Sequence, residues 1–150
     1  MSNSLRFKTS KFIDETYRVS FKFNNKTYFG FKGDTLASAL LANGVHLVGR
    51  SFKYHRPRGI MTSGSEEPNA MIQLHDNSSR TEPNVRATEV EIYEGLVASS
   101  QNCWPSVNFD VGGINNLLSP ILPAGFYYKT FMWPASFWEK YEYFLSLIHI

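Results

Sequence analysis

One short stretch of the sequence carries enough positive charge to bind an anion. Four cations, Arg50, Lys53, Arg56 and Arg58, lie within nine residues, together with His55 and without any acidic residue. Each arginine has a planar guanidinium group that can hold a phosphate or a carboxylate through two hydrogen bonds. Like charges in contact repel by about 1 kcal/mol per pair in water, so a negative partner is expected beside them. These five residues form the candidate cofactor-binding or interface site.

The kind of negative partner stays open at the level of sequence. Glu66 and Glu67 follow the cations closely, so these two glutamates and solvent are one way to offset the charge. The alternative is a phosphate, a carboxylate or the acidic surface of a partner. Pro57 fixes its own φ and pushes Arg56 toward an extended backbone, which stiffens the stretch. The arginines are therefore expected at fixed positions on a rigid loop.

A nucleic-acid site is disfavoured. Phe52, Tyr54 and His55 alternate with the cations, as in grooves that stack bases on aromatic rings. The formal net charge is only +2, however, and no second basic strip completes a groove. The stretch therefore predicts a local contact with an anionic cofactor or protein surface, and no nucleic acid is expected as a partner.

The sequence offers neither a metal site nor an activated nucleophile. His46, His55, His75 and His149 are scattered, with no close pair and no neighbouring cysteine ligand. The single cysteine, Cys103, cannot form an intrachain disulfide and is expected to be a buried, unreactive thiol. We therefore expect no catalytic residues within this chain.

A hairpin and a helix precede the basic stretch. Residues 18–32 alternate between apolar and polar side chains around Asn24 and Asn25, which predicts a β-hairpin. A helix follows, with Asp34 expected as its N-cap and Gly44 expected to end it with a positive φ.

Three further strands complete the prediction of an α+β domain. They are expected at residues 45–48, 70–74 and 88–93. A hairpin, a helix and further strands follow one another in a β-grasp domain, in which one helix crosses a small mixed sheet. We assign residues 18–95 to this domain and residues 1–17 to an N-terminal extension.

The chain beyond residue 95 has a different composition. Residues 96–140 contain three tryptophans, four prolines and few charges, which predicts an extended arm that packs on another surface. Short helices are expected at residues 115–118 and from Pro134, and the aromatic segment 126–138 is a candidate interface. The tail, residues 141–150, is atypical of what precedes it.

The composition is that of a globular protein without a membrane segment. It is 43% hydrophobic and 15% aromatic, which is too apolar for a disordered chain. The first nineteen residues lack the apolar core of a signal peptide, and no run of about 18 apolar residues exists. A cytoplasmic location and no membrane partner are expected.

Six stretches are specific in combination. They read GDTLASALLANGVHLVGRSFKYHRPRGI, SGSEEPNA, PNVRATEVEIYEGL, SQNCWPS, NNLLSP and PAGFYYKTFMWPASFWEK. In this order and spacing, from about Arg18 to Lys140, they resemble the N-terminal region of the α subunit of heterotetrameric sarcosine oxidase.

This resemblance implies a flavoenzyme that demethylates sarcosine oxidatively. Sarcosine, oxygen and water give glycine, formaldehyde and hydrogen peroxide, or methylenetetrahydrofolate when tetrahydrofolate is present. The resemblance implies partners, namely the remaining α-subunit domains and the β, γ and δ subunits. It also implies FAD, FMN and NAD in the full complex, zinc on the small subunit, and dinucleotide- and folate-binding regions further along the α subunit.

Two departures qualify that implication. Related ferredoxin-type modules carry cluster cysteines where this chain has GRSFKYHRPRGIMTSGSEEPNA, residues 49–70. One cysteine cannot supply the four ligands of a [2Fe–2S] cluster, so no iron–sulfur cluster is expected. The resemblance also stops after Lys140, and no glycine-rich dinucleotide fingerprint appears, which predicts an incomplete subunit that binds no cofactor alone.

We expect a structural, cofactor-docking fragment that is inactive alone. A non-enzymatic interaction module is the alternative, and a ferredoxin-like electron carrier ranks below it.

Overall fold

The computed structural model describes residues 6, 13–75, 80–117 and 119 of the chain. Its elements are β1 (Asp14–Phe23), β2 (Lys26–Lys32), α1 (Leu36–Ala42), β3 (Gly49–Arg50), β4 (Pro57–Arg58), β5 (Met71–His75), β6 (Thr81–Arg86), β7 (Leu96–Ser100), the 3₁₀ turn η1 (Val111–Gly113) and α2 (Ile114–Leu117). Residues 1–113 form one unit and residues 114–150 a second.

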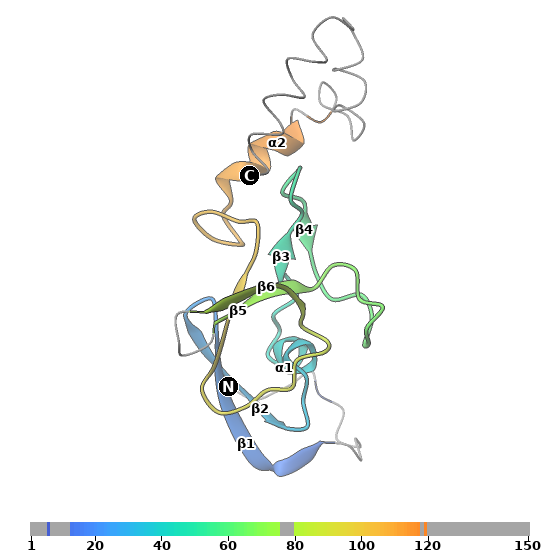
Figure 1. The fold of residues 1–150 in the computed structure, drawn as a ribbon, viewed down its shortest axis with the longest axis vertical. Coiled ribbons are helices and arrows are strands. Elements are labelled where there is room, and N and C mark those ends of the chain that lie inside the picture. Colours follow the sequence, from blue (N-terminus) through green and yellow to red (C-terminus); the bar gives the residue numbers. More distant parts are fainter. Residues whose placement is uncertain (1–5, 7–12, 76–79, 118, 120–150) are drawn as a thin grey trace, which may run out of the picture. The chain divides into compact units, whose positions relative to one another are not determined.

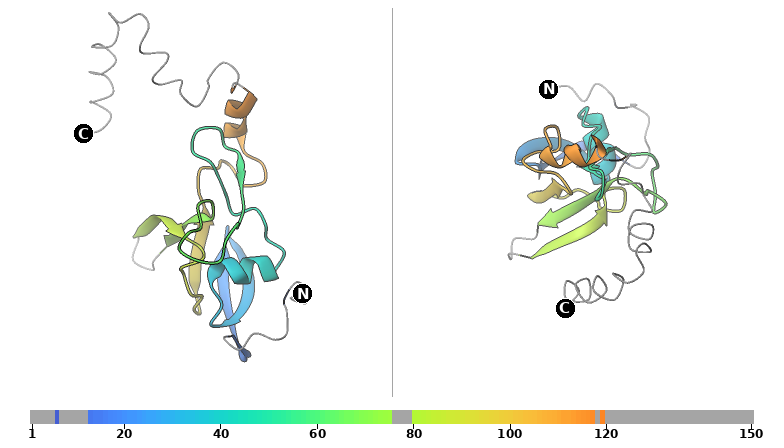
Figure 2. Two further views of the ribbon diagram at one scale, coloured as in Figure 1. Left: turned by 90° about the vertical axis from the view of Figure 1, so that its right-hand side faces the viewer. Right: turned by 90° about the horizontal axis from the view of Figure 1, so that it is seen from above.

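A mixed five-stranded sheet organises the first unit. Its strand order is β2-β1-β7-β5-β6, in which β1 and β7 run parallel and the other neighbours run antiparallel. Helix α1 packs on this sheet (Figures 1 and 2). Its Leu36 and Leu40 are buried in one core cluster with Phe21, Ile72 and Leu96. The predicted α+β, β-grasp class is therefore confirmed.

The predicted first hairpin is confirmed. Asn24 and Asn25 have φ values of 50° and 64°, which a two-residue turn of type I′ requires at both central positions. The turn sets a register in which Phe23 pairs with Lys26. That register places alternate side chains of β1, Phe21 and Phe23 among them, in the core.

The helix forms where it is predicted, but its cap differs. Thr35 is the N-cap, and its hydroxyl accepts a hydrogen bond from the Ser38 amide at 3.2 Å. The prediction of Asp34 as the N-cap was wrong. Asp34 precedes the N-cap by one residue, and its buried carboxylate accepts hydrogen bonds from the Phe31 amide at 2.9 Å and from the guanidinium of Arg6. The predicted stop is confirmed, since Gly44 has a φ of +75°.

Residues 87–92 do not form the predicted strand at 88–93. The amides of Leu36 and Ala37, at the unpaired start of α1, donate to the carbonyls of Val90 and Ala87 at 2.7 and 2.9 Å. The apolar and acidic alternation here reflects Ile92 entering the core while its neighbours face solvent. The segment therefore caps the helix instead of extending the sheet.

Strand β5 confirms the strand predicted at 70–74 within one residue. The strand predicted at 45–48 is absent, because these residues form a loop before β3.

The sequence predicts the end of the domain at residue 95, but β7 follows that position and lies between β1 and β5. Both of its neighbours supply hydrogen bonds and apolar contacts, so the sheet continues to Ser100.

Helix α2 falls on the predicted helical turn at 115–118. The expected helix from Pro134, the aromatic segment 126–138 and the tail 141–150 lie outside the described residues. Within the described part of the chain, no helix has the length and apolar character to cross a membrane.

Candidate functional site

The basic stretch forms a second, smaller hairpin made of β3 and β4. Gly49 pairs with Arg58 and Arg50 pairs with Pro57, and the hairpin extends from the end of the main sheet (Figure 1). The loop between the two strands closes on Ser51, whose hydroxyl accepts from the Arg56 amide at 3.0 Å. We refer to residues 49–58 as the basic hairpin.

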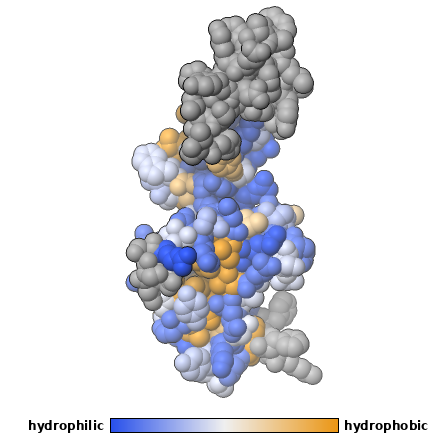
Figure 3. All heavy atoms as spheres, in the orientation of Figure 1, coloured by the Kyte–Doolittle hydropathy of each residue, from blue (hydrophilic) through white to orange (hydrophobic). Residues whose placement is uncertain are grey.

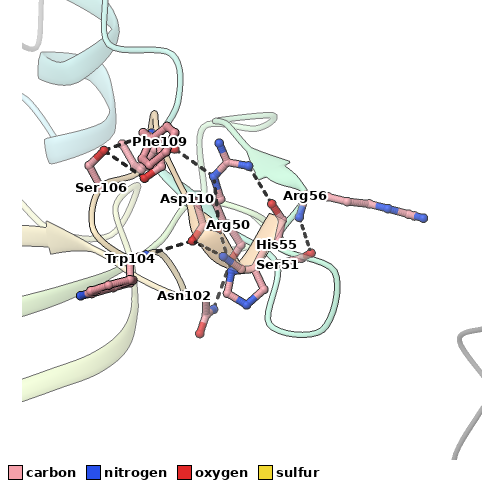
Figure 4. A network of polar contacts seen from close by, with 11 residues as sticks. Arg50, Ser51, His55, Arg56, Asn102, Trp104, Ser106, Phe109 and Asp110 are labelled. Carbon is pink, nitrogen blue, oxygen red and sulfur yellow. Dashed lines mark hydrogen bonds and ion pairs between the residues drawn. The ribbon is translucent and has the colours of Figure 1, made fainter. Parts of the chain in front are cut away.

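A buried carboxylate, that of Asp110, braces this hairpin. Its Oδ2 lies 2.7 Å from His55 Nδ1 and 3.6 Å from Arg50 Nε, and its side chain is fully buried (Figure 4). Its Oδ1 accepts from the amides of Trp104 and Gly112 at 3.0 and 3.2 Å. Burial raises the pKa of Asp110, but the hydrogen bonds from the two amides and from His55 outweigh this effect and hold the pKa below its ordinary value. The carboxylate is therefore charged at neutral pH.

Arg50 joins the hairpin to the segment that carries Asp110. Its Nε donates to the Val107 carbonyl at 2.9 Å, and its Nη1 donates to the carbonyl of His55 at 2.8 Å. Gly112 lies against the imidazole of His55 so closely that an added Cβ would come within 2.2 Å of Cε1. Only glycine fits at that position without displacing the ring.

The five predicted site residues therefore divide into two groups. Arg50 and His55 turn inward to Asp110, whereas Lys53, Arg56 and Arg58 are exposed. The guanidinium of Arg56 lies 4.7 Å from the ring centroid of Tyr54, and the Lys53 ammonium lies 5.3 Å from the same centroid. Arg58 donates to the side-chain oxygen of Asn69. The inner pair is structural, and the outer three present positive charge to the surroundings.

Sequence reasoning missed Asp110, although a signal exists. It is the sole acidic residue between Glu94 and Glu139, and two glycines follow one residue later. A lone acid in an apolar, aromatic segment is a candidate for burial with a basic partner.

Glu67 has a different role from the one considered for it. Its side chain is buried, and its Oε2 accepts from the amides of Met61 and Thr62 at 2.8 and 2.6 Å. Its Oε1 accepts from the amides of Asn69 and Ala70 at 2.8 and 3.2 Å. Burial raises the pKa of Glu67, but the four backbone donors lower it more, to about 2. Glu67 thus organises the loop between β4 and β5 and is not the counter-charge of the hairpin.

Large aromatic side chains are exposed around the same hairpin. Phe52, at its tip, is 85% exposed, and Trp104 and Phe109, on the braced segment, are 71% and 70% exposed. Much of the surface drawn in Figure 3 is hydrophilic, with smaller apolar areas between. Exposed aromatic rings beside cations are typical of protein interfaces, whose central residues are enriched in aromatic side chains and arginine.

One cleft of about 860 Å³ brings together residues that the sequence scatters. His46, His75 and Cys103 line it, along with residues 97–100 of β7. Burial and the charge of Asp110 raise the pKa of the Cys103 thiol, and the opposing effect of Arg50 is smaller. The thiol is therefore protonated at neutral pH. In the described ranges no three His, Cys, Asp or Glu side chains lie close enough to hold a metal ion.

Known proteins match this chain over most of its length. The family described as 2Fe-2S iron-sulfur cluster binding domain matches residues 16–103. The sarcosine oxidase subunit alpha of Rhizobium meliloti (strain 1021) is 59% identical over 138 residues, which cover 92% of this chain and 14% of that protein. Those of Corynebacterium sp. strains U-96 and P-1 are 45% and 37% identical over 46% and 58% of this chain, and 7% and 9% of their own length.

These findings confirm the resemblance drawn from the sequence. This chain spans about a seventh of the length of the Rhizobium relative that it matches. The family match includes the main sheet, α1, the basic hairpin and the Glu67 loop. The chain belongs to the family of 2Fe-2S iron-sulfur cluster binding domains.

Proposed function

We propose that the chain is the N-terminal region of a sarcosine oxidase α subunit and acts there as a docking module without catalytic residues. The full enzyme would convert sarcosine to glycine with formaldehyde or methylenetetrahydrofolate and hydrogen peroxide. The observation that carries this proposal is the 59% identity to a sarcosine oxidase subunit alpha over 92% of the chain. Identity at this level over most of the chain supports a shared fold and a shared place in the subunit.

The family's cluster does not fit this chain. A [2Fe–2S] cluster takes four protein ligands, usually thiolates, and the whole sequence holds the single thiol of Cys103. That thiol has a raised pKa, which disfavours the thiolate that binds iron. We therefore assign no redox step to this domain, and an electron-carrier function is disfavoured.

The basic hairpin is the docking element in this proposal. Asp110 holds Arg50 of β3 and His55 of the loop between the strands, so the exposed cations Lys53, Arg56 and Arg58 lie on a braced hairpin. Preorganised arginines bind anions with less entropic cost than flexible ones. Their targets would be phosphate groups of FAD, FMN or NAD, or an acidic surface on the remaining α-subunit domains or on the β, γ and δ subunits. A single cysteine agrees with assembly in the reducing cytoplasm.

The experiment places this chain in a complete enzyme. The matching residues of the Rhizobium α subunit are replaced by those of this chain, and the subunit is assembled with its partners with and without Arg56→Ala and Arg58→Ala. Charge-assisted hydrogen bonds contribute about 1.5–3 kcal/mol each, so the double variant should lower cofactor content or complex yield by roughly tenfold or more.

The matched control is Lys22→Ala with Lys26→Ala, which removes two exposed cations from the first hairpin. Released FAD, FMN and NAD, the size-exclusion profile and sarcosine-dependent hydrogen peroxide are measured for each enzyme. Equal cofactor content and assembly in the arginine and lysine variants would contradict the docking role.

A further inference from the structure

The loop between β4 and β5, residues 59–70, is built around one buried anion, the carboxylate of Glu67. Four backbone N–H groups converge on it from the two ends of the loop, two at Met61 and Thr62 and two at Asn69 and Ala70. The Thr62 hydroxyl adds a fifth donor at 3.2 Å. Backbone amides ordinarily pair with carbonyls of helices and strands, so this convergence marks a cradle for negative charge.

Concave arrays of backbone N–H groups are known anion sites, and many iron–sulfur centres lie in them. The inorganic and cysteine sulfurs of such a cluster carry negative charge and accept hydrogen bonds from the surrounding backbone. The donors around Glu67 are thus of the kind that a cluster requires. They lie inside the stretch that matches the cluster-binding family.

The spacing of the loop points in the same direction. Plant-type [2Fe–2S] ferredoxins place three cysteine ligands as C-x₄-C-x₂-C. Positions 62, 67 and 70 of this chain have that spacing and hold threonine, glutamate and alanine. Thr62 and Ala70 are two of the four amide donors, and Glu67 is the group that they bind. One spacing therefore describes both a ligand set and the observed carboxylate network.

We propose that residues 59–70 are the cluster cradle of this family and that the carboxylate of Glu67 occupies the place of the cluster. The loop keeps its shape through hydrogen bonds of one internal carboxylate, without iron or cysteine ligands. Asn69 transmits that shape outward, because its amide donates to Glu67 while its side-chain oxygen accepts from Arg58 of the basic hairpin. This inference stands on the loop itself and does not depend on the proposed enzyme.

A cysteine graft tests the position of the cradle. The variant Thr62→Cys, Glu67→Cys, Ala70→Cys of the full chain is titrated with Co²⁺, which takes tetrahedral thiolate sites with an open fourth position for water. The control carries Ser63→Cys, Glu66→Cys and Asn69→Cys, three new thiols in the same loop but off the spacing. Converging thiols raise the effective ligand concentration, so the graft should bind Co²⁺ roughly 10²-fold more tightly than the control.

Thiolate-to-cobalt absorption reports binding, and circular dichroism reports folding in the same samples. If the graft is unfolded without metal, Co²⁺ should restore the native spectrum, as structural metals do in small domains. Equal Co²⁺ affinity in graft and control, or failure of Co²⁺ to bind or refold the graft, would overturn the proposal.

Removal of the carboxylate tests its role as a cluster substitute. Glu67→Ala should have a lowered melting temperature that sodium formate raises more than sodium chloride of equal ionic strength, because formate fills the emptied cradle. If Glu67→Ala does not fold from denaturant in chloride, formate should increase the folded yield. Wild type and Glu66→Ala, which removes an exposed neighbour, should show no such preference. No formate-specific effect on Glu67→Ala would count against the substitution.

Discussion

The charge of Glu67 should make a large contribution to the stability of the domain, and Glu67→Gln isolates it. The change keeps the shape of the side chain but replaces one accepting oxygen by an NH₂ group. That group faces two backbone N–H donors, either those of Met61 and Thr62 or those of Asn69 and Ala70. Two donors are then left unpaired in a buried site, where each costs about 1–3 kcal/mol.

The pKa gives a second route to the magnitude. The pKa of Glu67 falls from 4.5 to about 2 in the folded protein. Each unit of pKa difference corresponds to about 1.4 kcal/mol, so the charged form contributes on the order of 3 kcal/mol to folding. The folded pKa lies below the unfolded one, so this contribution is complete above about pH 5 and is lost as the pH falls toward 2.

Urea unfolding of the 150-residue chain at several pH values measures both effects. Near neutral pH, Glu67→Gln should be less stable than wild type by about 3 kcal/mol, and the difference should shrink as the pH falls through 4 toward 2. The control is Glu66→Gln, an exposed substitution that should change stability by about 0.5 kcal/mol or less. A Glu67→Gln variant as stable as this control at neutral pH, or a pH-independent difference, would contradict stabilisation by the charge of Glu67.

Three further substitutions probe the brace and the first hairpin. Gly112→Ala forces a Cβ to within 2.2 Å of the His55 ring and should cost about 1–3 kcal/mol in thermal unfolding, whereas unchanged stability would contradict the packing. Asp110→Asn should lower the free energy of unfolding by about 2 kcal/mol. It should also lower the pKa of Cys103, seen as faster alkylation by iodoacetamide at mildly alkaline pH. An unaltered alkylation rate would contradict an effect of the Asp110 charge on Cys103. Asn25→Ala, at φ 64°, should destabilise by about 1 kcal/mol relative to Asn25→Gly in urea unfolding, and equal stability of the two would exclude the left-handed turn.

The parts of the fold that local sequence determines were predictable. Asn24 and Asn25 tolerate the positive φ of a tight turn, the alternation of β1 fixes its buried face, and Gly44 permits the end of the helix. Each of these features depends on residues within a few positions of one another. Their prediction therefore needed no knowledge of the tertiary structure.

Long-range hydrogen bonds decided the features that were predicted wrongly. Residues 88–93 alternate like a strand, but the unpaired amides at the start of α1 bind the carbonyls of Val90 and Ala87. Strand β7 is rich in small and polar residues, and it becomes central because β1 and β5 both offer it a free edge. Neither pairing can be read from residue types alone.

The candidate site shows the same limit for charged residues. Glu66 and Glu67 are identical in type and adjacent, yet one is exposed and the other binds four amides inside the loop. The cluster of cations was evident from the sequence, whereas its buried counter-charge, Asp110, lies more than fifty residues away from Arg50 and His55. Sequence proximity located the cations, and only the fold identified their partner.

Hydrogen–deuterium exchange compares the basic hairpin in the isolated chain and in the assembled enzyme. If this braced hairpin contacts the rest of a sarcosine oxidase, residues 51–57 should exchange more slowly in the assembled enzyme than in the isolated chain. The Asn24–Asn25 turn serves as an internal reference for the same domain. Equal exchange of residues 51–57 in the two states would contradict the docking role of the hairpin.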